Sequence, residues 1–203
     1  GAFNDHYKID PVIFKAWMSV LKNDGSGGSS VIWALRHGAE HTLRASAAIL
    51  KVDSARLIFS AFFPKGQHLQ IKGLSDLFLD TPLYNAHSTA SDMLWAQVPV
   101  LTLPVEKMAA RAAASILLAG GMGVGIARTV ADYRDLAPRL ARATSRMRQA
   151  DGPLDLRILA RSVLFDEEVF AKGMLRCVRL MAEMHLLAFH EYGGKLFHLL
   201  IAA

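Results

Sequence analysis

The sequence predicts an α/β fold in which a parallel sheet is flanked by helices. Short apolar runs have the length of buried strands, and each is followed by a stretch whose apolar residues recur at helical spacing. This alternation is typical of parallel strands joined by right-handed helical crossovers. Hydrophobic residues make up 52% of the 203 residues and charged residues 20%, which is the composition of a globular protein. The expected strands are residues 31–35, 56–60, 77–79 and 100–102.

The expected helices alternate with these strands. The first has Asp10 as its N-cap and Pro11 as its first residue, since Asp accepts backbone N–H groups and Pro has none to leave unsatisfied. The glycine-rich residues 120–125 follow a helix and lack the G-x-G-x-x-G spacing, so we interpret them as a helix end that leads into a short strand at 124–127. Further helices are expected at 40–52, 64–74, 88–97, 107–118, 130–149, 154–163 and 165–191, before an apolar tail at 196–203.

Charge and cysteine content limit the function classes. The 23 Lys and Arg against 18 Asp and Glu give a net charge of +5. Much of this excess lies at helical spacing between Arg128 and Arg161 without interleaved aromatic residues, which favours a solvated helix face over a nucleic-acid groove. The single cysteine, Cys177, excludes an intrachain disulfide and favours a reducing compartment, the cytoplasm or nucleus. No apolar run reaches the roughly 18 residues of a membrane span, and no signal peptide is recognisable.

Polar residues gather where two of the expected strands end. His87, Ser88 and Thr89 follow strand 77–79 and open the next helix, whose N-terminus offers free N–H groups and a partial positive charge. Ser88 or Thr89 can equally serve as a plain helix cap, which spacing alone favours. Lys65 and His68 follow strand 56–60 on the same expected rim, where open parallel sheets bind ligands. Histidines elsewhere lack the further ligands of a metal site, so no metal is expected.

Four motifs of the sequence combine into one pattern. They are FNxxYKID from Phe3, PKxxH from Pro64, DTPLxNxHSTxxDxLWA from Asp80 and RxAAS from Arg111. From Phe3 to about residue 192 the chain resembles the C-terminal lobe of the O-linked N-acetylglucosaminyltransferases. The first motif is shared with the plant protein O-fucosyltransferases, but those have a threonine run where this chain has His87. The resemblance therefore implies a GT-B glycosyltransferase that moves GlcNAc from UDP-GlcNAc to Ser or Thr of proteins.

The resemblance implies roles for individual residues. Lys8 would be the catalytic residue, stabilising the negative charge that builds on the departing UDP. His87, Ser88 and Thr89 would hold the diphosphate at the helix N-terminus. UDP-GlcNAc would be the donor substrate, with no metal or other cofactor. The residues implied to hold the nucleoside are Lys65 and Asp92 at the ribose, His68 against the uracil ring and the backbone of Phe63 at the base edge.

Three departures from the family pattern leave a second interpretation open. Asp5 stands where the family usually has Gln, and a carboxylate beside a diphosphate is repulsive unless it is paired. Gln70 stands where the family has an Arg near the uracil, and Ser88 replaces a Thr but keeps the hydroxyl. Asp5 and Gln70 favour weaker donor binding or another nucleotide sugar. The alternative is a non-catalytic pseudoenzyme lobe that acts as a nucleotide-binding or interaction module.

The resemblance also predicts how the chain is organised. We expect residues 3–128 to form a Rossmann-like lobe that binds the nucleotide sugar, residues 129–203 to add helices packed on the same lobe, and residues 1–2 to be a cloning scar. The partners implied are the family's N-terminal catalytic lobe, its tetratricopeptide repeats and a protein acceptor. We interpret the chain as an excised lobe or a divergent fragment, and we expect little transferase activity from it alone.

Overall fold

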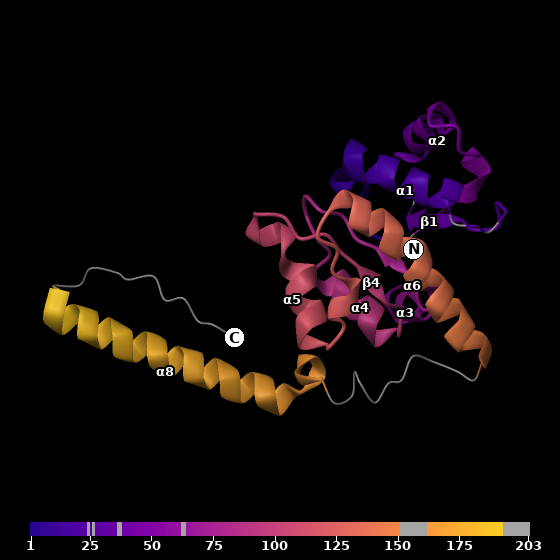
Figure 1. Cartoon of the computed structure of the whole chain (residues 1–203). Coiled ribbons are helices and arrows are strands. Elements are labelled where there is room, and N and C mark those ends of the chain that lie inside the picture. The colour runs from indigo at the N-terminus through magenta and orange to yellow at the C-terminus, as the bar shows by residue number, and fades with distance from the viewer. Residues whose placement is uncertain (24, 26, 36–37, 62–63, 151–161, 193–203) are drawn as a thin grey trace.

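The computed structural model describes residues 1–23, 25, 27–35, 38–61, 64–150 and 162–192. Figure 1 shows a body of strands and helices, from which one long helix extends. Most of the helix expected at 154–163 lies outside the described residues, as does the whole apolar tail at 196–203.

All four predicted strands form. They are β1 (Ile32–Leu35), β2 (Leu57–Ser60), β3 (Phe78–Leu79) and β4 (Val100–Leu101). β1 pairs in parallel with β2, with Ile32 opposite Leu57, and β3 pairs in parallel with β4, with Phe78 opposite Val100. The strands lie at the positions that their apolar runs predict, and the α/β class with parallel pairing is confirmed.

The first two residues join the two strand pairs. The N–H of Ala2 donates to the carbonyl of Trp33 at 2.7 Å, and the N–H of Leu79 donates to the carbonyl of Gly1 at 2.8 Å. The Gly1 ammonium also donates to the carbonyl of Leu77 at 2.6 Å, and its burial lowers the pKa of this amine to about 5. The sheet order is therefore β2, β1, residues 1–2, β3, β4. Residues 1–2 are therefore part of the folded body, and Ala2 is buried.

Seven helices are described, and they follow the predicted order. They are α1 (Pro11–Asn23), α2 (Glu40–Ile49), α3 (Lys65–Lys72), α4 (Ser88–Trp95), α5 (Ala112–Ala119), α6 (Val130–Ala150) and α8 (Glu167–Tyr192). The predicted cap of α1 is confirmed, because Asp10 Oδ1 accepts from the N–H groups of Val12 at 2.8 Å and Ile13 at 3.0 Å. The helix expected at 107–118 is divided into a 3-10 turn, Met108–Ala110, and α5.

The prediction of a strand at 124–127 is wrong. Gly123–Gly125 forms a 3-10 turn, and only an isolated parallel bridge joins Ile126 to Thr102 beside β4. Gly125 approaches β4 so closely that a Cβ atom there would lie 2.1 Å from the carbonyl oxygen of Val100. Glycine at position 125 allows this close approach of the two backbones, and the pairing with β4 is limited to the bridge at Ile126.

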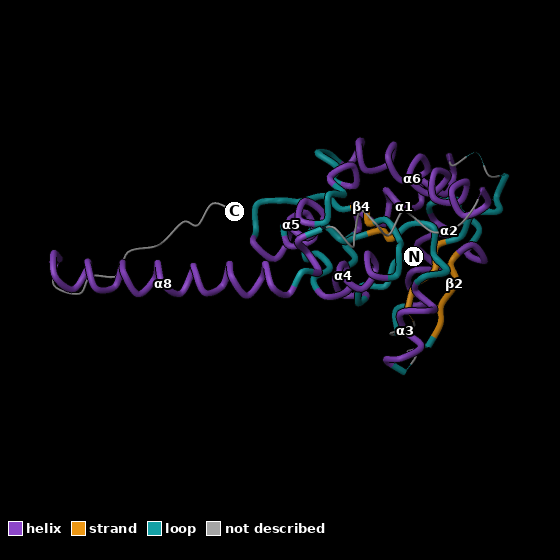
Figure 2. The backbone as a smooth tube through the Cα atoms, turned by 90° about the horizontal axis from the view of Figure 1, so that it is seen from below, coloured by secondary structure: helices purple, strands orange, loops and turns teal. Residues whose placement is uncertain are grey.

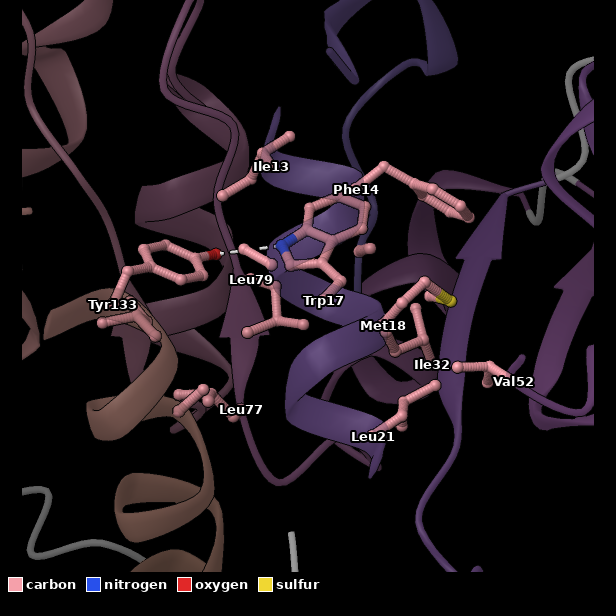
Figure 3. Close-up of a cluster of buried hydrophobic side chains, with 14 of the residues drawn as sticks. Ile13, Phe14, Trp17, Met18, Leu21, Ile32, Val52, Leu77, Leu79 and Tyr133 are labelled. Carbon is pink, nitrogen blue, oxygen red and sulfur yellow. Dashed lines mark hydrogen bonds between the residues drawn. The ribbon is translucent and has the colours of Figure 1, made fainter. Parts of the chain in front are cut away.

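Two apolar clusters fill the body. In the first, α1 and α6 pack on the sheet, and Figure 3 shows Trp17 and Tyr133 joined at its centre by a hydrogen bond of 3.3 Å from Nε1 to the hydroxyl. In the second, α4 and α5 cover β3 and β4 around Phe78 and Met93. Tyr133 donates in turn to the carbonyl of Asp80 at 3.0 Å, so the first cluster is tied to the end of β3.

The position of helix α8 differs from what we expected, which was that all helices after residue 129 pack on the same lobe. α6 does pack there, but the described side chains of α8 are exposed or half-buried, Phe170 for example at 67%. Figures 1 and 2 show α8 extending from the body in both views. Its start is anchored where Phe165 meets Trp95 edge-on, with ring centroids 5.2 Å apart. None of the helices in the described ranges combines the length and hydropathy that a membrane crossing needs.

Candidate functional site

The loop between β3 and α4, residues 80–87, lies at the carboxyl end of β3. The N–H of Asn85 donates to the carbonyl of Ala109 at 2.9 Å, and His87 Nε2 lies 3.3 Å from the same oxygen. A carbonyl oxygen can only accept a hydrogen bond, so this contact favours the His87 tautomer in which Nε2 carries the hydrogen. The 3-10 turn that carries Ala109 thus supports the loop from one side.

The Asp80 carboxylate supports the same loop from inside. It is fully buried, and its Oδ1 accepts from the N–H of Ala86 at 2.7 Å and from Asn4 Nδ2 at 2.9 Å. Its Oδ2 accepts from the hydroxyl of Thr102 at 2.7 Å. Burial raises the pKa of Asp80 to about 6, although the hydrogen bonds oppose that rise. One carboxylate therefore connects the N-terminal segment, the loop and the end of β4.

Thr81 extends this network along the loop. Its hydroxyl accepts from Asn4 Nδ2 at 2.7 Å and donates to the carbonyl of Tyr84 at 2.8 Å, while its carbonyl accepts from Asn85 Nδ2 at 2.9 Å. The sequence motifs contain these residues, but pattern reasoning assigns them no role. The signal that could have identified them is the presence of several polar residues directly after an apolar strand, where unsatisfied burial would be costly.

The N-terminus of α4 is not capped by a side chain. His87 occupies the N-cap position with φ −102° and ψ −97°, and its side chain makes no capping hydrogen bond. In the described part of the chain, no acceptor is found for the backbone N–H of Ser88 or of Thr89. The interpretation of Ser88 or Thr89 as a plain cap is therefore wrong. Two N–H donors at a helix N-terminus remain available to an anion.

Lys8 reaches the same loop from a distant part of the sequence. It ends the 3-10 turn His6–Lys8, and its ammonium donates to the carbonyl of Asn85, 77 positions away, at 3.4 Å. The ammonium also lies 3.9 Å from the ring centroid of Tyr84. Among the described residues no carboxylate forms a salt bridge with Lys8. Its positive charge is therefore not neutralised at the loop.

Three of the four residues expected at the nucleoside, Lys65, His68 and Asp92, lie on α3 and α4. Asp92 Oδ2 forms a salt bridge of 2.9 Å with Lys72 Nζ, whose side chain is only 3% exposed against 42% for Asp92. Burial lowers the pKa of His68, the positive charge of Lys72 lowers it further, and Asp92 opposes this. This lowered pKa favours the neutral imidazole of His68, which lies near the Lys72–Asp92 pair. Lys65 begins α3 but its side chain is not described, and Phe63 lies outside the described residues.

A cavity of about 480 Å³ lies elsewhere, at the opposite end of the strands. Its lining includes Gly1, Val31, Leu77 and Arg142, and none of the predicted site residues. Of the residues expected at the site, Lys8 and His87 meet the open helix N-terminus at the loop, away from this cavity. No cluster of three His, Cys, Asp or Glu residues suited to a metal ion is found within the described ranges.

The fold and the rim loop define an α/β domain of the Rossmann-like kind, with polar groups gathered at the carboxyl ends of parallel strands. The model of glycosyl transferase family 41 matches residues 1–174. The chain therefore belongs to glycosyl transferase family 41, the O-GlcNAc transferase family, and the resemblance seen in its motifs is confirmed.

Two relatives and one solved structure illustrate the similarity. The chain is 42% identical over 144 residues to the probable UDP-N-acetylglucosamine–peptide N-acetylglucosaminyltransferase SEC of Arabidopsis thaliana. The matched segment covers 70% of this chain and 14% of that protein. It is 38% identical over 141 residues to the corresponding Caenorhabditis elegans transferase, covering 68% and 12%. The K341M mutant of the Thermobaculum terrenum O-GlcNAc transferase superposes with a TM-score of 0.75 at 26% identity, covering 88% of this chain and 34% of that one. The chain thus spans only a small part of its relatives, within the O-GlcNAc transferase catalytic region.

Proposed function

We propose that this chain binds UDP-GlcNAc at the 80–87 loop and stabilises UDP as the leaving group in transfer to Ser or Thr of a protein. One observation carries the proposal. The Lys8 ammonium contacts Asn85, 77 positions away in sequence, in the loop that leads into the N-terminus of α4, and no side chain caps that N-terminus. An unneutralised ammonium and two open N–H groups are suited to a dianionic diphosphate.

The chemistry follows from where charge develops. When the bond from the sugar's anomeric carbon to the phosphate oxygen breaks, its electron pair stays on that oxygen and the diphosphate becomes more negative. Lys8 and the N–H groups of Ser88 and Thr89 then interact more strongly with the transition state than with the bound donor, which lowers the barrier. The Asp80 network keeps these donors in place before the charge develops, so little reorganisation is needed.

The nucleoside would lie toward α3 and α4. The Asp92 carboxylate can accept hydrogen bonds from the hydroxyls of a ribose, and its salt bridge with the buried Lys72 orients it. A neutral His68 can stack on a uracil ring without competing for the phosphate charge. Lys65 and the backbone of Phe63 remain proposed contacts to the ribose and the base. The lobe boundary near residue 128 and a cytoplasmic or nuclear location also remain proposals.

The remaining partners would be other parts of the polypeptide. Because the chain covers 14% and 12% of its curated relatives, we propose that an N-terminal catalytic lobe, tetratricopeptide repeats and a protein acceptor complete the reaction. No pair of nucleophile and general base is assigned within this chain. We therefore expect it to transfer little GlcNAc to a peptide by itself. Transfer detected with the purified chain would overturn that part of the proposal.

Calorimetry with UDP tests donor binding. We expect micromolar affinity, and a loss of about 10- to 100-fold in Lys8→Ala and His87→Ala, the range for losing a hydrogen bond to a charged group. Lys15→Ala and His41→Ala are matched controls, because both residues are exposed on other helices. No binding at millimolar UDP would favour the alternative of a non-catalytic interaction module, which the family departures at Asp5 and Gln70 support.

A further inference from the structure

Tyr84 lies between two of the proposed diphosphate ligands, and the function described so far gives it no role. The Lys8 ammonium is 3.9 Å from the centroid of its ring, the geometry of a cation–π contact. The ring also meets the imidazole of His87 edge-on, with centroids 5.3 Å apart and planes at 66°. One side chain therefore contacts both Lys8 and His87.

The position of this ring is determined by the buried network behind it. The carbonyl of Tyr84 accepts from the hydroxyl of Thr81 at 2.8 Å, and that hydroxyl is itself held by Asn4. The next residue, Asn85, is held through its side chain to Thr81 and through its N–H to Ala109. The backbone is thus fixed on both sides of Tyr84, while the residue itself is 39% exposed. Tyr84 is fixed at the loop surface and is not a core residue.

A comparison with Lys72 shows what an aromatic partner does for Lys8. The ammonium of Lys72 is paired with the Asp92 carboxylate at 2.9 Å, so its charge is largely neutralised locally. A ring face restricts a lysine side chain without neutralising it, because the attraction comes from the ring quadrupole and not from a negative charge. Lys8 has the ring of Tyr84 and the long 3.4 Å contact to Asn85, so its ammonium is restrained without a carboxylate partner among the described residues.

We propose that Tyr84 is a positioning residue for Lys8: its ring holds the ammonium beside the N-terminus of α4, ready for the diphosphate of the donor. This inference rests on the proposed function, because it concerns how the same site meets its ligand. An unrestrained lysine would lose rotamer freedom on binding, and the ring removes part of that cost beforehand.

Calorimetry with UDP on the full chain compares Tyr84→Phe and Tyr84→Leu with the wild type. Tyr84→Phe keeps the ring face, and we expect its affinity within about twofold of the wild type. Tyr84→Leu keeps an apolar side chain without a quadrupole, and we expect about three- to tenfold weaker binding. Ile49→Ala is the control, since this apolar residue is exposed on α2 and lies outside the loop, and the variant should bind as the wild type does.

A double-mutant cycle separates positioning from a structural role of Tyr84. If the ring acts through Lys8, Tyr84→Leu should cost almost nothing in a Lys8→Ala background. Equal losses in both backgrounds would overturn the proposal, because the ring would then act on the loop and not on the lysine. Thermal denaturation of each variant identifies any that has lost its fold, and Tyr84→Phe serves as the conservative variant.

A second measurement needs no ligand. In proton–carbon spectra, the ε-CH2 protons of Lys8 should be shifted upfield by the ring current of Tyr84, and this shift should persist in Tyr84→Phe and vanish in Tyr84→Leu. Wild-type protein without the shift would overturn the proposal. Wild-type protein that shows the shift but binds no UDP would overturn the proposed function, whereas UDP binding unaffected by Tyr84→Leu would overturn only the role of Tyr84.

Discussion

In the 80–87 loop three polar side chains lie inside the protein, whereas along α8 many apolar side chains lie outside it. Asp80, Thr81 and Asn85 are buried, and their hydrogen bonds come from segments far apart in the sequence. On α8, Phe170 and Leu175 are exposed on a helix that extends from the body. The two regions therefore depart in opposite directions from the usual rule of apolar residues inside and polar residues outside.

The difference shows which part of the chain is stabilised by its own contacts. A buried polar group is tolerated only where its partners are in place, so these hydrogen bonds stabilise the observed conformation of the loop. The described side chains of α8 gain little from their position, and their substitution should cost little. The following experiments test this contrast, beginning with the largest expected effect.

Removal of the Asp80 side chain should damage the protein most. In Asp80→Ala, the N–H of Ala86 and the hydroxyl of Thr102 lose a buried acceptor. We expect the free energy of unfolding to fall by about 4 kcal/mol, the scale of breaking a buried charged network. Urea denaturation followed by circular dichroism measures it. A loss below about 1 kcal/mol would show that the loop does not depend on this network.

The pH dependence of stability should also depend on Asp80. Burial raises its pKa from the ordinary 3.8 to about 6, so between these values the native state holds a proton that the unfolded state has lost. The free energy of unfolding attributable to Asp80 therefore decreases as pH rises from about 4 to about 6, by on the order of 3 kcal/mol, and is constant above that range.

The isosteric variant Asp80→Asn isolates this contribution. It cannot ionise, and its amide can donate to Thr102 because a hydroxyl also accepts. Urea denaturation at several pH values should give curves for wild type and variant that converge at low pH and separate by pH 6. Parallel curves would contradict the buried, proton-binding carboxylate.

Loss of one hydrogen bond of the network should have an intermediate effect. Thr102→Val removes the hydroxyl that donates to Asp80 Oδ2 and keeps the side-chain shape. We expect a loss of about 1–2 kcal/mol in the free energy of unfolding. Thr102→Ser retains the donor and should lose less. If the two variants lose equally, packing of the methyl group contributes as much as the hydrogen bond.

Substitution on α8 should have the smallest effect. For Phe170→Ser combined with Leu175→Ser, we expect a change within about 0.5 kcal/mol in the free energy of unfolding, as for exposed positions in general. Binding of a hydrophobic dye should decrease, because two exposed apolar side chains are lost. A large loss of stability would show that this face of α8 packs on part of the protein and would end the contrast with the loop.

Local patterns predicted most of the secondary structure. Apolar runs mark β1 to β4, and Asp10 followed by Pro11 marks the start of α1, because strand burial and helix capping depend on residues close together in sequence. The family motifs likewise indicated the loop and Lys8. The strands and the start of α1 were found at or near the expected positions, whereas the roles of the loop and Lys8 stay proposals.

The sequence by itself thus determined the α/β class, the order of the elements and the family. Only the tertiary structure decided that residues 1–2 join the two strand pairs and that Asp80 connects three segments. It also decided that Ile126 forms a single bridge where a strand was expected, and that α8 leaves the body. The physical reason is the range of the interactions. Periodicity and capping act over a few residues, whereas a sheet bridge or a buried carboxylate is satisfied by partners tens of residues away, which no local pattern specifies.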